Sequence, residues 1–119
     1  MSGNVIRDKS FQFALDVIKL YKQLTAVKEF ALSKQLLRSG TSIGANVEEA
    51  GEAQSRKDFT SKMNIALKEA RETCYWLRLL QESDLVKLDF RRELASAEEL
   101  VRILASIVKT TKETPPHTP

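Results

Sequence analysis

The chain has 119 residues, a formal net charge of +3 at pH 7 and an isoelectric point near 9.1. This length fits one domain with a single hydrophobic core. All three prolines lie in the last five positions and glycine occurs only four times, so residues 1–114 contain no proline that would break a helix. The single cysteine, Cys74, excludes an internal disulfide and a cysteine-based metal site. The composition therefore favours an all-α protein.

The hydropathy of the chain argues against two classes of protein, membrane-spanning proteins and secreted proteins. No apolar run approaches the roughly 18 residues of a membrane span. The first residues, MSGNVIRDKS, lack the apolar core of a signal peptide. We therefore expect a cytoplasmic protein that does not associate with a membrane. Its mildly basic charge is compatible with nucleic acid as a partner, although it does not require one.

Hydrophobic periodicity predicts four helices joined by short links. Their expected bounds are about residues 10–24, 28–53, 56–83 and 89–112. Ser55 begins a capping-box pattern with Asp58 for the third helix, and Asp89 is placed to cap the fourth. We expect residues 1–9 to form a flexible N-terminus and residues 113–119 a disordered tail. Four helices with short links predict an antiparallel up-down four-helix bundle.

The first predicted helix carries two apolar faces. Phe11, Leu15 and Ile18 fall on one side, and a second set falls roughly opposite: Phe13, Val17, Leu20 and Leu24. A helix at the edge of a monomeric bundle needs only one apolar stripe. The helix is therefore either sandwiched within the bundle or shared with another subunit. We assign the second set to an oligomer interface.

The stretch QLLRSGTSIGANVEEAGEA, residues 35–53, contains three of the four glycines. The apolar residues on either side of them keep one helical phase, which predicts a single continuous helix. Each internal glycine costs about 1 kcal/mol relative to alanine. The small residues fall on one ridge, where they would let a neighbouring helix backbone come close: Ser33, Gly40, Gly44 and Gly51.

Two alternatives to close packing exist for this stretch. A phosphate-binding loop would follow a strand and carry a lysine after its last glycine, and neither feature is present at Gly44. A kink or break near residues 39–42 is the other alternative. The same stretch holds Arg38, Asn46, Glu48 and Glu49, for which a structural network is favoured over a functional surface.

Catalytic and metal-binding patterns are missing from the sequence. A di-iron site in a helical bundle needs Glu-x-x-His motifs, and the only histidine is His117, in the expected tail. The paired glutamates are better explained by ion pairs along helix faces. Cys74 borders an apolar face, as a small core residue does. We predict no metal, no cofactor and no enzymatic activity.

The strongest functional pattern lies on the third helix. Six residues without an acid among them fall within one arc of about 80° on a helical wheel of 100° per residue; they are Lys57, Asn64, Lys68, Arg71, Tyr75 and Arg78, and we call them the basic stripe. Cations with an interleaved aromatic suit contact with phosphates and bases. The alternative is a solvated face, or a face neutralised by acids of the second or fourth helix.

A different set of side chains occupies the flank of the third helix. Ile65, Trp76 and Leu79 form what we call the apolar strip. A tryptophan is costly to expose, so we expect another helix or subunit to cover this strip. Together with the first helix, it predicts a homo-oligomer.

Two sequence segments resemble a known family. LSKQLLRSGTSIGANVEEA and AQSRKDFTSKMNIALKEARETCYWLRLL are similar to the four-helix-bundle proteins named for intervening sequences in 23S ribosomal RNA genes, and the similarity covers residues 11–82. The resemblance implies a bundle whose subunits form a ring, commonly a pentamer. It also implies kinship with the accessory protein of diversity-generating retroelements, a basic pentameric barrel that works with reverse transcriptase and nucleic acid. The biochemical role of the family is largely undefined.

Two functional hypotheses follow. In the first, the chain is a non-enzymatic oligomeric protein that binds RNA or DNA through the basic stripe. In the second, it is a protein-interaction scaffold that binds a protein partner and no nucleic acid.

Overall fold

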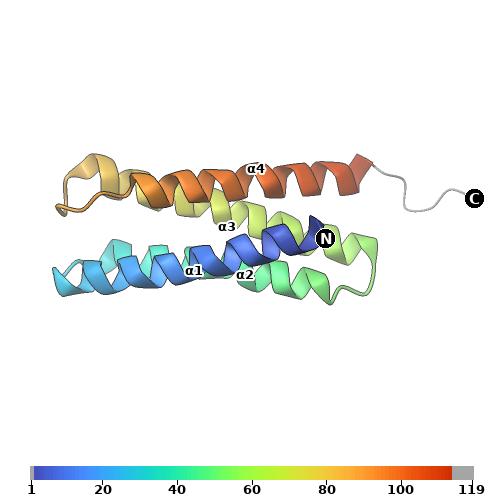
Figure 1. Cartoon of the computed structure of the whole chain (residues 1–119), viewed down its shortest axis with the longest axis horizontal. Coiled ribbons are helices and arrows are strands. Elements are labelled where there is room, and N and C mark those ends of the chain that lie inside the picture. The colour runs from blue at the N-terminus through green and yellow to red at the C-terminus, as the bar shows by residue number, and fades with distance from the viewer. Residues whose placement is uncertain (1, 114–119) are drawn as a thin grey trace, which may run out of the picture.

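The computed structural model describes the backbone of residues 2–113 and the side chains from residue 5 onward. Four α-helices run alternately up and down in one elongated bundle (Figure 1); they are α1 (Ser2–Ala26), α2 (Ala31–Gly51), α3 (Arg56–Ser83) and α4 (Arg91–Glu113). Each helix packs against its neighbours in the chain, and α1 also packs against α4. The predicted all-α, antiparallel up-down four-helix bundle is therefore confirmed. Of the expected disordered tail, residues 114–119 lie outside the described residues.

The start of α1 differs from the sequence prediction. The helix begins at Ser2 instead of about residue 10, so the expected start of the first helix is wrong. Ile6 is fully buried, and the Arg7 guanidinium lies 2.9 Å from the Glu48 carboxylate of α2. Ile6 precedes Phe13 by two helical turns and therefore extends the same buried face. This burial anchors a segment whose polar composition resembled a frayed terminus.

The buried face of α1 is the one that sequence analysis assigned to an oligomer interface. Its four side chains are between 0% and 4% exposed in the single chain: Phe13, Val17, Leu20 and Leu24. The interface assignment is therefore wrong, because α2 and α4 already cover this side. The opposite face carries the exposed apolar side chains. Phe11 is 62% exposed, and Leu15 and Ile18 are each 40% exposed; we call these three residues the α1 outer face.

Close packing of α1 against α2 occurs at two glycines. A Cβ atom added to Gly40 would lie 2.8 Å from Cγ2 of Val17, and one added to Gly44 would lie 3.4 Å from the carbonyl oxygen of Ser10. Ser33 is fully buried on the same helix. Gly51, the last residue of α2, meets nothing within 4 Å, so the close-packing prediction is wrong there. The helix continues through residues 39–42, which excludes a break.

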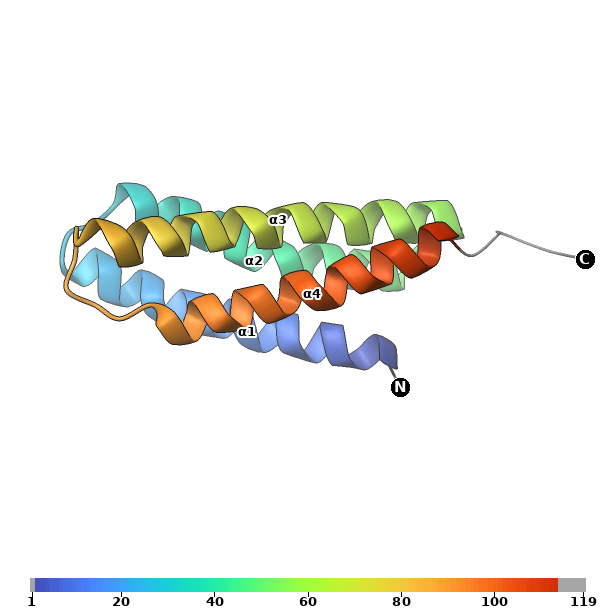
Figure 2. The same ribbon diagram turned by 90° about the horizontal axis from the view of Figure 1, so that it is seen from above.

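The helix ends are held by local polar contacts. The Ser55 hydroxyl accepts a hydrogen bond from the Asp58 amide at 3.1 Å, which confirms the predicted cap of α3. At the start of α4, Asp89 accepts hydrogen bonds from the Arg91 side chain and amide, and these lower the pKa of Asp89 to about 2. The connection from α3 crosses the end of the bundle (Figure 2), where Phe90 is fully buried. This end of the core is closed by an aromatic ring.

The two glycines with different surroundings provide a matched pair of variants. Gly40→Ala should lower the free energy of unfolding by about 1–3 kcal/mol, because the stiff β-branched Val17 cannot move aside without repacking. Gly51→Ala should raise it by up to about 1 kcal/mol, because the new methyl group meets open space and alanine favours the helix. Urea unfolding followed by circular dichroism measures both changes. Equal effects of the two substitutions would contradict the close approach of α1 and α2.

Candidate nucleic-acid interface

The basic stripe lies on the side of α3 that faces away from the core. The core side of α3 is formed by small and aliphatic residues, and its fully buried members include Ala66, Ala70 and Leu77. On the other side, five stripe residues are exposed and one, Asn64, is half-buried; the exposed ones are Lys57, Lys68, Arg71, Tyr75 and Arg78. All six predicted side chains therefore share one accessible surface.

The cations of this surface are mostly unneutralised. Arg78 pairs with Glu82 on its own helix at 3.5 Å, and both side chains are well exposed. Within residues 5–113, no carboxylate lies within ion-pair distance of Lys57, Lys68 or Arg71. Acids of α2 and α4 thus leave these three cations without a salt bridge. Their positive charge remains available to an external anion.

Tyr75 is the aromatic member of the basic stripe. Its side chain is 54% exposed. The ring contacts Trp76 in an edge-on arrangement, with 5.2 Å between the ring centroids and 68° between the planes. In such a contact the edge of one ring meets one face of the other, so at least one face of the Tyr75 ring is not covered by Trp76. Tyr75 can therefore offer a face for stacking beside the cations.

One end of the basic stripe opens into a hollow between α3 and α4. Lys57 and Asn64 line this hollow of about 380 Å³ together with Thr111 and Lys112 from the end of α4. Sequence analysis missed Lys112 as a member of the surface. The antiparallel topology contained the signal, because it places the end of the fourth helix beside the start of the third. Lys112 adds a cation to the predicted set.

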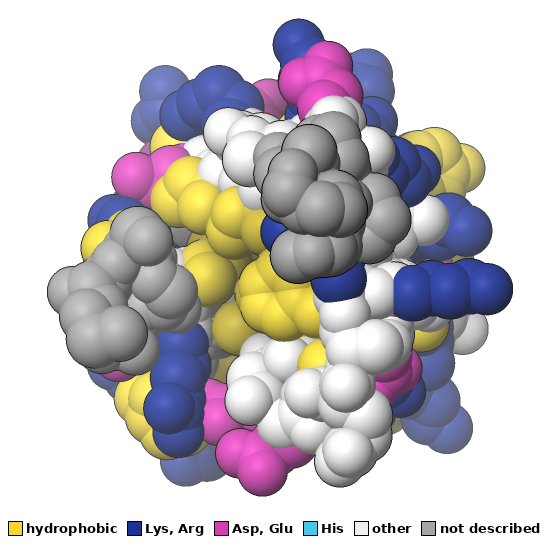
Figure 3. All heavy atoms as spheres, turned by 90° about the vertical axis from the view of Figure 1, so that its right-hand side faces the viewer, with side chains coloured by type: hydrophobic (Ala, Val, Ile, Leu, Met, Phe, Trp, Pro, Cys, Tyr) yellow, Lys and Arg dark blue, Asp and Glu magenta, His cyan; other side chains and the backbone are white. Residues whose placement is uncertain are grey.

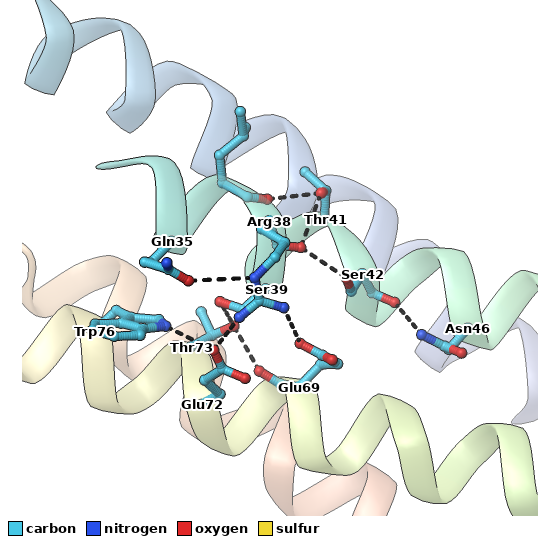
Figure 4. Close-up of polar contacts among 11 residues, drawn as sticks. Gln35, Arg38, Ser39, Thr41, Ser42, Asn46, Glu69, Glu72, Thr73 and Trp76 are labelled. Atoms are coloured by element: carbon cyan, nitrogen blue, oxygen red, sulfur yellow. Dashed lines mark hydrogen bonds and ion pairs between the residues drawn. The ribbon is translucent and has the colours of Figure 1, made fainter. Parts of the chain in front are cut away.

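Two acidic residues of α3, Glu69 and Glu72, lie toward α2, where Arg38 holds them (Figure 4). The Arg38 guanidinium pairs with Glu72 and lies 3.3 Å from Glu69, and its Nε donates to Gln35 at 3.4 Å. The indole N–H of Trp76 donates to Glu72 at 3.1 Å. Arg38 therefore belongs to a structural network that joins α2 to α3. The network also keeps two carboxylates on the flank away from the basic stripe.

Other polar residues of α2 join it to its neighbours. Glu49 accepts a hydrogen bond from Lys62 of α3 at 2.9 Å, which raises the pKa of Lys62. Glu48 pairs with α1, as described above. Asn46 differs, because its side-chain amide donates only to the Ser42 carbonyl of its own helix, at 2.9 Å. The expected structural network is thus present for the charged residues, whereas Asn46 contributes only to α2.

A buried pair of hydroxyls lies beneath the Arg38 network. Ser39 of α2 and Thr73 of α3 are both fully buried, and their hydroxyl oxygens are 2.9 Å apart. The Thr73 hydroxyl also lies 2.7 Å from the carbonyl oxygen of Glu69. Buried hydroxyls need such partners, since desolvating an unpaired one is costly. The pair fixes the register of α2 on α3.

The apolar strip is partly covered within the chain. Ile65 is 39% exposed, whereas Trp76 and Leu79 are half-buried. Trp76 packs against the core cluster and is held by its bond to Glu72. The cover expected for the tryptophan therefore comes in part from its own bundle.

Cys74 is the one cysteine among the described residues. Cys74 is half-buried, and burial raises the pKa of its thiol, with a further increase from the nearby Glu98 carboxylate. A raised pKa leaves the thiol protonated and weakly nucleophilic at neutral pH. Among residues 5–113, no three His, Cys, Asp or Glu side chains come together as a metal site. His117 lies outside the described residues.

Comparison with known proteins identifies the family of this bundle. The family model described as 23S rRNA-intervening sequence protein matches residues 3–106. The chain belongs to this family. The chain is also similar to a solved structure, a protein of unknown function from the S23 ribosomal protein family of Bacteroides thetaiotaomicron. The two chains are 50% identical with a TM-score of 0.86, and the match covers 92% of this chain and 99% of the other.

Two negative findings complete the comparison. No curated protein matches the chain. In the described part of this family member, no helix is both long enough and apolar enough to cross a membrane.

The buried hydroxyl pair predicts an asymmetric pair of variants. Thr73→Val should lower the free energy of unfolding by about 1–3 kcal/mol, because it strands the Ser39 hydroxyl in the core. Ser39→Ala should cost less, because Thr73 keeps the Glu69 carbonyl as a partner. The double variant should cost less than the sum of the single ones. Urea unfolding of all four proteins measures the coupling, and strictly additive costs would contradict a bond between the two side chains.

Proposed function

We propose that this chain is a non-enzymatic cytoplasmic module that binds RNA or DNA through the basic stripe of α3. The observation that carries the proposal is the set of cations on this face, Lys57, Lys68 and Arg71, which have no carboxylate partner in the described chain. A solvated structural face would be expected to pair more of its charges with neighbouring helices. Here Glu69 and Glu72 of α3 are instead paired with Arg38 of α2.

The dimensions of the stripe fit a nucleic-acid backbone. From Lys57 to Arg78 the helix advances about 30 Å at 1.5 Å per residue. This length is close to one turn of duplex DNA, about 34 Å. Cations along such a line can neutralise successive phosphates and release counterions. Tyr75 would add stacking on an unpaired base or a sugar.

We also propose that the protein self-associates. The α1 outer face and the apolar strip lie on helices that do not pack against each other in the bundle. Two different apolar surfaces on one subunit favour a head-to-tail contact, which closes into a ring when the rotation per subunit allows it. The resemblance to the accessory protein of diversity-generating retroelements points to five subunits. A ring would repeat the basic stripe and strengthen binding through multivalency.

The second candidate function is a protein-interaction scaffold without nucleic-acid binding. Exposed apolar side chains favour the scaffold. In addition to the α1 outer face, Val27 and Phe30 in the α1–α2 link are 55% and 60% exposed. Single exposed apolar residues are common on protein surfaces. We therefore rank this candidate below nucleic-acid binding.

A salt titration with a matched charge control tests the proposed nucleic-acid function. The wild type should bind RNA fragments or generic duplexes at low salt, with affinity that falls steeply as salt rises. Lys68→Ala/Arg71→Ala should reduce the slope of log K against log salt by about 2 and weaken binding roughly ten-fold. Fluorescence anisotropy at several salt concentrations measures both quantities.

The control for this experiment is Lys19→Ala/Lys22→Ala. It removes the same charge from exposed positions of α1, and its binding should stay close to that of the wild type. Equal losses in the two double variants would show that only net charge matters. A wild type that does not bind at low salt would leave the scaffold as the better function, as would a protein partner retained after nuclease treatment.

Self-association is tested by multi-angle light scattering. The wild type should elute as an oligomer at micromolar concentration, and Phe11→Ser/Ile18→Ser should shift it toward the 13.5 kDa monomer. Leu85→Ser is the matched control, because Leu85 is 58% exposed but lies outside both apolar surfaces. It should leave the mass unchanged. A wild type that is monomeric at this concentration would refute the oligomer.

A further inference from the structure

A cavity opens at the end of the bundle where α1 begins and α4 ends. Its volume is about 870 Å³, and we call it the end cavity. Apolar side chains from all four helices line it, and Figure 3 shows a hydrophobic hollow at this end; the lining includes Ile6, Val47, Phe59, Met63, Ile103 and Ile107. Ile6, Val47 and Met63 are at most 4% exposed, so the walls belong to the hydrophobic core.

The two ends of the bundle are filled differently. At the α3–α4 connection, Phe90 and large aliphatic residues fill the core, and Phe90 is fully buried. At the other end, Phe59 is the aromatic residue of the wall and is only partly buried, and Gly51 contributes no side chain. The cavity is open to solvent at the end of the bundle, and its half-buried apolar side chains, Phe59, Ile103 and Ile107, expose part of their surface there. The volume falls within the range of about 300–1,000 Å³ that is typical of ligand pockets.

The charged residues at the mouth are not equivalent. Arg7 and Glu48 neutralise each other through their ion pair at 2.9 Å. Arg102, on the α4 wall next to Ile103, makes no hydrogen bond or ion pair with any described residue. Glu52, the residue after the end of α2, contributes one carboxylate to the lining. Arg102 is the cation of the lining that has no partner among the described residues.

We propose that the end cavity binds a small amphipathic molecule with an apolar chain and an anionic head, such as a medium-chain carboxylate. The chain packs against the half-buried side chains of Phe59, Ile103 and Ile107, and the head pairs with Arg102. A guanidinium recognises a carboxylate through two parallel hydrogen bonds. Binding removes the exposed parts of these apolar side chains from water. The site is separate from the basic stripe and does not depend on the proposed nucleic-acid function.

Met63 supplies a probe inside the cavity wall. It is one of two methionines in the chain, the other being Met1. With ¹³C-methyl methionine, decanoate below its micelle concentration should shift the Met63 methyl resonance in a saturable titration. Decanol should bind more weakly than decanoate, because it lacks the charge. Decyltrimethylammonium should bind most weakly, because its head is repelled by Arg102.

Two variants separate the roles of head and chain. Arg102→Gln should weaken decanoate binding roughly five-fold and leave decanol binding unchanged. Lys109→Gln, which removes the same charge from an exposed position of α4 outside the wall, should change neither. Ile107→Trp should abolish the binding of both ligands by occupying the space, without a lower melting temperature. If that variant misfolds, Ile103→Phe serves the same purpose.

Several results would overturn the proposal. The first is the absence of a Met63 shift with decanoate, and the second is binding of decyltrimethylammonium as tight as that of decanoate. The third is loss of binding in Phe11→Ser, which would place the ligand on the α1 outer face. A Met63 resonance that moves with protein concentration before any ligand is added would show that a second copy fills the cavity. Nucleic-acid binding should be the same for Arg102→Gln and Lys109→Gln.

Discussion

The close approach of α1 to α2 at Gly40 is the constraint on which the rest of the bundle depends. Without a side chain at this position, Val17 fits directly against the α2 backbone. That contact turns one apolar face of α1 into the core and leaves the α1 outer face in solvent. The absence of a side chain at Gly40 thus helps to determine which face of α1 is exposed to solvent.

The same placement of α2 separates the charges of α3. Arg38 projects from α2 onto Glu69 and Glu72, so these acids face α2 and lie beside the buried Ser39–Thr73 pair. Lys57, Lys68 and Arg71 of α3 are left exposed and without a salt bridge to any described residue. Ion pairs at such exposed positions contribute little to stability on their own. The larger effect of the Arg38 ion pairs is electrostatic. They hold Glu69 and Glu72 toward α2, and the exposed cations of the basic stripe then carry positive charge that these two acids do not neutralise.

The four helices, the Ser55 cap and the close contact at Gly40 were predictable from the sequence, because each rests on local periodicity or on a residue type with few uses. The choice between the two faces of α1 was not predictable from the sequence. A helical wheel shows that both faces are apolar, but it does not show which one α2 and α4 cover. The helical start of α1 was missed because one buried residue, Ile6, outweighs its polar neighbours. The exposure of the basic stripe and the end cavity could not be predicted, since both depend on how side chains of different helices meet.

The two ends of the bundle also differ as sites for attaching a tag, a dye or a surface tether. α1 begins and α4 ends beside the end cavity, whereas both the α1–α2 and α3–α4 links lie at the opposite end (Figures 1 and 2). A purification tag or a fluorescent protein fused to either terminus would therefore crowd the mouth of the cavity. The link between α3 and α4, with Leu85 exposed at 58%, is the better point for attaching a dye or a surface tether. An immobilised protein anchored there would keep its cavity and the start of its basic stripe directed toward the solution.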